Sequence, residues 1–185
     1  AYRRQRQMCI RDRLEAIMKG TQADLNWLAD PKVFAVNRLN AYSDHSYYLD
    51  IDKALNGDAM ELKQSLNGRW YFNYAKNPNE RFVDFYKEDI DCHYFDMIDV
   101  PGHIQMQGYD QMQYINTLYP WDGHEKLRPP HISSDDNPVG SYVCYFEVNE
   151  ALKNKTTRLV FDGVETAYYV CLLYTSDAAD DMQCV

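Results

Sequence analysis

Residues 69–75 read RWYFNYA, and this short aromatic run decides the fold class. Runs rich in Tyr, Phe, Trp and Val, bounded by Gly, Asn and Pro, are typical of β-strands. Turn sequences such as NPNE, at residues 77–80, separate this run from similar ones. The similar runs occupy residues 81–86, 96–101, 113–120, 140–148, 157–164 and 166–170. This spacing of short strands predicts an all-β fold, a jelly-roll β-sandwich, over residues 65–170.

The residues that precede this domain follow a different pattern. Apolar residues are irregularly spaced around Pro31, and residues 50–64 are mostly polar, with room for about one helical turn. A pattern without a sustained period predicts neither a long helix nor a strand. We therefore expect residues 14–64 to form an extended arm with a short helical turn, lying on another part of the protein.

The two ends of the chain are related to each other. With one choice of codons, the DNA that encodes Arg3–Asp12 has a complementary strand that encodes Cys171–Asp180 residue for residue. Two native segments have no reason to be encoded by opposite strands of one oligonucleotide. We therefore expect residues 1–13 and 171–185 to be translated from a sequencing adapter, and we exclude them from fold reasoning. The arginine-rich start then does not indicate nucleic-acid binding, and the jelly roll is expected to be truncated at Val170.

Composition narrows the class of protein further. Without the two ends, the chain has 14 basic and 24 acidic residues, a net charge of −10. This charge argues against binding to nucleic acid or to anionic membranes. No apolar run approaches the ~20 residues that a membrane helix needs. Cys92 and Cys144 are too few for a disulfide framework, so we expect reduced thiols and a cytoplasmic location.

The stretch KEDIDCHYFD, residues 87–96, gathers carboxylates beside a histidine. Glycoside hydrolysis needs two facing carboxylates, ~5–5.5 Å apart for retention and ~6.5–9.5 Å for inversion. Neighbours on a strand point to opposite faces, which excludes the pair Glu88 and Asp89. Asp89 and Asp91 fit one face, but we interpret them as a solvated acidic edge. A metal needs three or four convergent ligands, which this spacing does not provide. The residues alone therefore predict no catalytic site and no metal site.

Longer motifs carry a resemblance to a known family. They are QSLNGRWYF (64–72), DVPGHIQMQGYDQMQYINTLYPW (99–121), RPPHISSDDNPVGSYVCYFEV (128–148) and TRLVFDGVETAYYV (157–170). In order and spacing they resemble the N-terminal sugar-binding jelly roll of the β-galactosidases of glycoside hydrolase family 2. The lead-in DPKVFAVNRL (30–39) resembles the arm that precedes that domain. The resemblance covers about Asp24 to Val170.

The resemblance implies a parent enzyme that hydrolyses terminal β-D-galactosyl residues, lactose included, with retention. In this family the two catalytic glutamates lie on a later (β/α)₈ barrel, together with the magnesium and sodium ligands. This chain is then expected to be an inactive fragment with no catalytic residue and no cofactor of its own. The parent is expected to be a homo-oligomer.

One substrate contact of the family maps onto this chain. The resemblance implies that the asparagine of the Y-x-N-x-x-Y-P motif, here Asn116, reaches from a jelly-roll loop into the active site of the barrel. The alternative is that its side chain only bonds the local loop backbone. An amide suits this role because it donates to and accepts from sugar hydroxyls without adding charge. Tyr109, Tyr119 and Trp121, in the same region, are interpreted as packing residues.

A second class of function stays open from the sequence alone. The many aromatic residues are interpreted mainly as core and cross-strand packing. In a free-standing, non-catalytic carbohydrate-binding module, however, some of them would form an exposed platform for sugars. A module of this kind binds sugar without a barrel, whereas the fragment of a β-galactosidase is not expected to.

Overall fold

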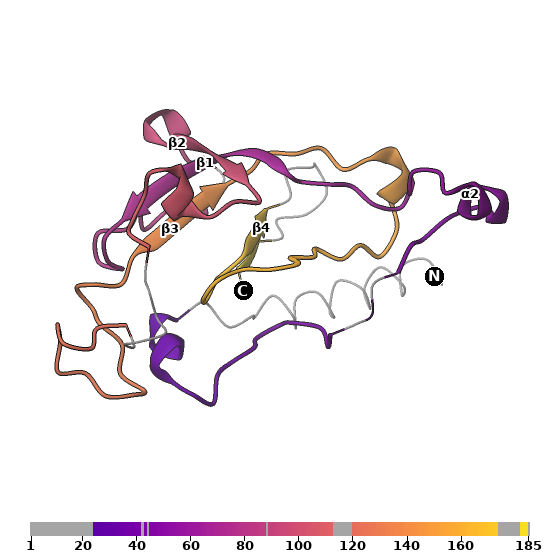
Figure 1. Cartoon of the computed structure of the whole chain (residues 1–185). Coiled ribbons are helices and arrows are strands. Elements are labelled where there is room, and N and C mark those ends of the chain that lie inside the picture. Colours follow the sequence, from indigo (N-terminus) through magenta and orange to yellow (C-terminus); the bar gives the residue numbers. More distant parts are fainter. Residues whose placement is uncertain are drawn as a thin grey trace, which may run out of the picture.

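The computed structural model describes residues 24–41, 43, 45–87, 89–112, 120–173 and 182–184. A three-stranded antiparallel sheet, with β1 (Gly68–Ala75) at its centre, is the main element. On either side of β1 lie β2 (Asp96–Val100) and β3 (Val139–Val143) (Figure 1). A second, two-stranded sheet pairs β4 (Cys171–Leu173) with β5 (Met182–Cys184). The prediction of an all-β, incomplete sandwich is confirmed.

A cluster of packed rings lies on the face of the sheet that carries Phe72, while the buried Ala75 and Phe95 lie on the other face. Phe72 is fully buried, and its ring contacts Tyr109 and Tyr142 with centroid distances of 4.8 Å to each. Gly140 allows this arrangement, because a Cβ there would lie 2.8 Å from the ring of Phe72. Trp70 is paired with Ile98, which is also buried. Among the described residues, the buried hydrophobic side chains are Phe72, Ala75, Phe95 and Ile98.

Helices in the described residues are short. The 3-10 helices are η1 (Leu25–Ala29), η2 (Cys92–Tyr94), η3 (Ile104–Gln107) and η4 (Glu150–Leu152), and the α-helix is α2 (Ile51–Asn56). The predicted helical turns of the arm correspond to η1 and α2. Each begins at an aspartate, Asp24 or Asp50, whose side chain accepts from a backbone N–H of the first turn. In the part of the chain that is described, no helix is long and apolar enough to cross a membrane.

Two glutamine side chains form hydrogen bonds with backbone groups that have no partner on a neighbouring strand. The amide of Gln107 pairs with the backbone of Asp99, accepting from its N–H at 2.8 Å and donating to its carbonyl at 3.0 Å. Gln64 bridges Glu147 and Asn149 in the same manner, with both distances 2.8 Å. These contacts satisfy backbone groups at places where no strand continues the sheet.

The arm is held against the last part of the domain by an aromatic contact. Trp27, on η1, stacks on Tyr169 with a centroid distance of 6.3 Å, and the Tyr169 hydroxyl donates to the carbonyl of Asp24 at 2.9 Å. Partial burial, followed by the charge of Asp24, raises the pKa of Tyr169. The expectation that the arm lies on another part of the protein therefore holds at η1.

Several predicted strands are wrong. Residues 81–86 form a turn that is stabilised by the ion pair of Asp84 and Lys87, at 3.0 Å, while Phe82 packs on Phe95. Residues 144–148, 157–164 and 166–170 have strand-like composition but no strand, because no segment of the described chain pairs with them. The predicted run 113–120 falls almost entirely outside the described residues.

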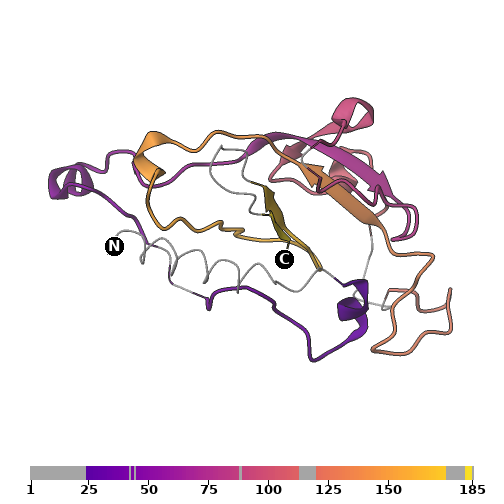
Figure 2. The same cartoon turned by 180° about the vertical axis from the view of Figure 1, so that it is seen from behind.

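The unpaired segment carries an exposed apolar surface. From β3 the chain runs away from the sheet to η4 and turns back to β4 (Figure 2). Along the return, five large apolar side chains are each at least 39% exposed: Leu159, Val160, Phe161, Val164 and Tyr168. An apolar surface of this kind normally packs against another layer of structure.

Candidate functional site

The region that carries the predicted substrate contact is bounded on its N-terminal side by Tyr109. The helix η3 ends at Gly108, whose left-handed φ of 94° turns the chain back over the sheet. The Tyr109 hydroxyl then donates to Asp96 Oδ2 at 2.8 Å, while its ring lies against Phe72. Partial burial, followed by the hydrogen bond to Asp96, raises the pKa of Tyr109. Tyr109 is thus a packing residue, as predicted.

The side chain of the next residue, Asp110, makes a second contact between this segment and its surroundings, on η3 and β1. Its φ of 57° is left-handed, a conformation that Asp tolerates better than most residues. Gln105 Nε2 lies 3.5 Å from Asp110 Oδ2. Partial burial of the Tyr74 hydroxyl, followed by the charge of Asp110, raises the pKa of Tyr74. The carboxylate of Asp110 is therefore directed toward the sheet.

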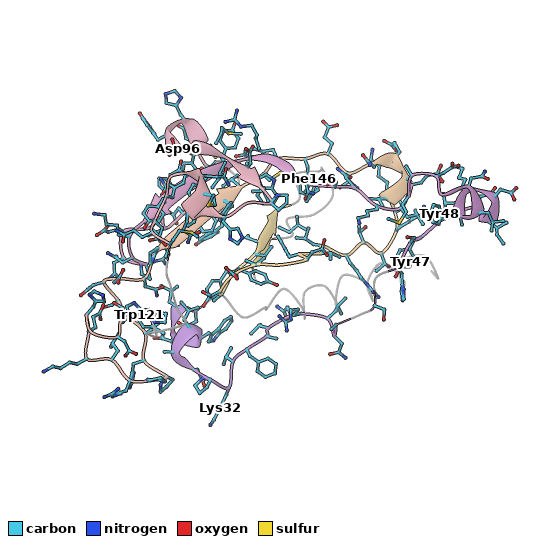
Figure 3. The ribbon with its side chains drawn as sticks, in the orientation of Figure 1. Lys32, Tyr47, Tyr48, Asp96, Trp121 and Phe146 are labelled. Carbon is cyan, nitrogen blue, oxygen red and sulfur yellow. The ribbon has the colours of Figure 1, made fainter. Side chains whose placement is uncertain are left out.

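Trp121 bounds the same region on its C-terminal side (Figure 3). Its indole N–H donates to the carbonyl of Asp136 at 2.5 Å, and its own carbonyl accepts from the N–H groups of His124 and Glu125. Trp121 is therefore also a packing residue, as predicted. The predicted contact residue, Asn116, and the predicted packing residue Tyr119 lie outside the described residues.

The loop that follows Trp121 is organised by a buried hydroxyl. Ser133 is 2% exposed and donates to Glu125 Oε1 at 2.6 Å. Its oxygen accepts from the backbone N–H groups of Asp135 and Asp136, at 3.1 Å and 2.9 Å. These bonds fix the carbonyl of Asp136 that receives the indole N–H of Trp121. Both flanks of residues 113–119 are thus held by side-chain hydrogen bonds.

An open depression lies on the opposite face of the sheet from Phe72. It has a volume of about 420 Å³ and is lined by Tyr71, Asp91, Cys92, His93, Phe95 and Tyr145. Tyr71 and Tyr145 meet edge to face with centroids 6.1 Å apart. Cys92 Sγ lies 3.8 Å from the Tyr145 hydroxyl, and partial burial followed by this contact raises the pKa of Tyr145.

Sequence reasoning missed this depression. Tyr71 and Tyr145 are far apart in the chain, and the antiparallel pairing of β1 with β3, which sets Tyr71 opposite Val143, brings them together. The signal in the sequence was the presence of two tyrosines in each of two strand-like runs, Tyr71 and Tyr74 in the first and Tyr142 and Tyr145 in the second. Asp91, interpreted as part of a solvated edge, also has a structural role, since it accepts from the N–H of His93 at 2.9 Å and caps η2.

The acidic stretch does not form a metal site in the described residues. Asp91 caps a helix and Asp96 accepts from Tyr109, so both carboxylates have local partners. No group of three or more His, Cys, Asp or Glu side chains that could hold a metal ion occurs in the described part of the chain. Glu88, another member of the stretch, lies outside it.

Comparison with known proteins assigns the domain to a family. The sequence model of the family "Glycosyl hydrolases family 2, sugar binding domain" matches residues 63–176. The chain therefore belongs to glycosyl hydrolase family 2, and it carries the sugar binding domain of that family. The predicted resemblance is confirmed.

The individual relatives are β-galactosidases. The chain is 54% identical to the β-galactosidase of Clostridium acetobutylicum over 153 residues, which cover 83% of this chain and 17% of that protein. It is 54% identical to the β-galactosidase of Halalkalibacterium halodurans over 82% of this chain and 15% of that protein. The chain is 49% identical to the β-galactosidase large subunit of Leuconostoc lactis, over 82% of this chain and 26% of that subunit. The chain thus spans between about a seventh and a quarter of the length of these relatives.

Proposed function

We propose that this chain is the N-terminal part of a β-galactosidase that hydrolyses terminal β-D-galactosyl residues, lactose included, with retention at the anomeric carbon. The observation that carries the proposal is the 54% identity to two β-galactosidases over more than four fifths of the chain. The family match over residues 63–176 supports it independently of any single relative.

In this proposal the chain supplies a scaffold and one substrate contact. Asn116 binds a hydroxyl of the galactosyl unit, and the flanks that hold its loop are the Tyr109–Asp96 and Trp121–Asp136 hydrogen bonds. The two glutamates that break the glycosidic bond belong to a barrel that follows this domain in the parent protein. We place the magnesium and sodium ions of the family on that barrel too.

Two further properties of the parent protein form part of the proposal. We place it in the cytoplasm, in agreement with Cys92 and Cys144 as free thiols. We also propose that it is a homo-oligomer. The arm before Ser65 extends from the sheet to α2 at the far end of the structure (Figure 1), which suits a segment that lies on a neighbouring subunit.

The proposal is tested in a chimeric enzyme. In the β-galactosidase of Clostridium acetobutylicum, the 153-residue matching region is exchanged for the residues of this chain. The chimera is expected to hydrolyse a chromogenic galactoside. Asn116→Ala in the chimera is expected to lower kcat/KM by about 10–100-fold, the effect of removing one or two hydrogen bonds to a sugar in a buried site.

Asn79→Ala is the matched control, because Asn79 is exposed in the turn after β1. It is expected to leave kcat/KM unchanged. A folded but inactive chimera would contradict the proposal for the domain, and an Asn116→Ala variant with unchanged kcat/KM would contradict the role of Asn116. The first of these results would favour the alternative of a non-catalytic carbohydrate-binding module.

A further inference from the structure

The open depression on the face of the sheet opposite Phe72 is lined by both aromatic and polar side chains. Its volume, about 420 Å³, lies within the range of roughly 300–1,000 Å³ that is common for small-molecule sites. Three aromatic rings line it, from Tyr71, Phe95 and Tyr145. A carboxylate and an imidazole, from Asp91 and His93, lie at the same place. Apolar rings beside a few polar groups are typical of sites that orient a ligand.

The ring of Tyr145 is available to a ligand. Tyr145 is 62% exposed, although one edge-to-face contact with Tyr71 holds it in place. Its hydroxyl oxygen lies 3.8 Å from Cys92 Sγ, a weak contact. An exposed aromatic ring that is fixed on two sides loses little conformational entropy when a ligand stacks on it.

The polar groups of the depression select the class of ligand. The carboxylate of Asp91 uses Oδ1 to cap η2, which fixes the side chain and leaves Oδ2 to accept from a ligand. A negative charge in the site, on a chain with a net charge of −9, disfavours anionic ligands. A single carboxylate with one imidazole does not provide the three or four ligands of a metal site. A neutral molecule with an apolar face and several hydroxyl donors fits best.

We propose that Tyr71, Asp91, His93 and Tyr145 form a second carbohydrate site, which binds a neutral hexose or a short saccharide of hexose units. The C–H face of one sugar ring stacks on Tyr145, a ring hydroxyl donates to Asp91 Oδ2, and the imidazole of His93 bonds a neighbouring hydroxyl. The site is open to solvent, so it accepts an internal unit of a longer chain as well as a free disaccharide. No residue of the segment that carries Asn116 belongs to it. The expectation that the fragment alone does not bind sugar concerns the barrel-dependent pocket of Asn116, and binding at this second site does not involve that pocket.

The site is tested by lactose binding to the purified 185-residue chain, measured by saturation-transfer difference NMR over a millimolar range. Tyr145→Ala is expected to weaken the apparent affinity by about tenfold or more, because stacking is lost. Tyr145→Phe keeps the ring and is expected to stay within about threefold of the unsubstituted chain. Asp91→Asn keeps the helix cap, since Asn caps as well as Asp, and is expected to weaken binding several-fold.

Tyr47→Ala is the matched control. Tyr47 is a 51% exposed tyrosine that lies near α2, away from the three-stranded sheet (Figure 3). Absence of any saturation transfer from lactose, or binding that Tyr145→Ala and Asp91→Asn leave unchanged, would overturn the second site. Binding that is lost in Asn116→Ala and kept in Tyr145→Ala would overturn it as well. The activity of the chimera does not depend on Tyr145, so the proposed function and the second site fail separately.

Discussion

The purified 185-residue chain is expected to hydrolyse no galactoside. Retaining hydrolysis requires a nucleophile and an acid/base carboxylate ~5–5.5 Å apart on opposite sides of the scissile bond. Among the described residues, the depression beside Tyr145 contains a single carboxylate, that of Asp91, and this group already caps a helix. A single fixed carboxylate cannot supply both roles. Under the proposed function, this chain supplies a scaffold, and the two catalytic carboxylates belong to a later part of the parent protein.

The measurement is the release of nitrophenol from a chromogenic galactoside, with a preparation from cells that carry the empty vector as the background. The rate of the chain is expected to equal this background at every pH between 5 and 9. A rate above it that is abolished by substituting any single carboxylate of this chain would contradict the account.

The second large effect is expected from Phe72→Ala. Phe72 is fully buried between the rings of Tyr109 and Tyr142. The neighbouring Gly140 has no side chain that could fill the space of the lost ring. Removing a buried phenylalanine costs about 3–5 kcal/mol. A whole domain is held together by only ~5–15 kcal/mol, and the described core here is small. The substitution is therefore expected to unfold the three-stranded sheet.

Limited proteolysis and near-ultraviolet circular dichroism of the purified chain report this loss. Phe34→Ala is the control, because Phe34 is 84% exposed in the arm and is expected to change neither signal. Equal protease resistance of the Phe72→Ala variant and the unsubstituted chain would show that the core lies elsewhere.

The existence of strands β1, β2 and β3 was predicted from the sequence, because local and tertiary signals agree there. In β1, Trp70 and Phe72 alternate with residues of the other face, and turn residues bound the run on both sides. The segments 157–164 and 166–170 have the same signals and form no strand in the described chain. A strand needs a partner for its backbone groups, and composition does not reveal whether a partner is present.

The candidate sites were predictable to different degrees. The role of Asn116 rests on the motif around it and stays a prediction, whereas the depression of Tyr71 and Tyr145 depends on the register of β1 and β3. Register is a long-range property, since a shift by one residue moves a side chain to the opposite face. The packing roles of Tyr109 and Trp121 were predictable, but their partners, Asp96 and Asp136, were not.

The most direct test of the central claim is the sequence of the source gene downstream of the codon for Val170. Because the chain spans only 15–26% of the relatives it matches, the reading frame is expected to continue for several hundred codons. It should complete the sandwich and then encode a (β/α)₈ barrel with two glutamates at the carboxyl ends of its strands. A stop codon within a few tens of codons, with no barrel downstream, would contradict the account and leave a free-standing carbohydrate-binding module.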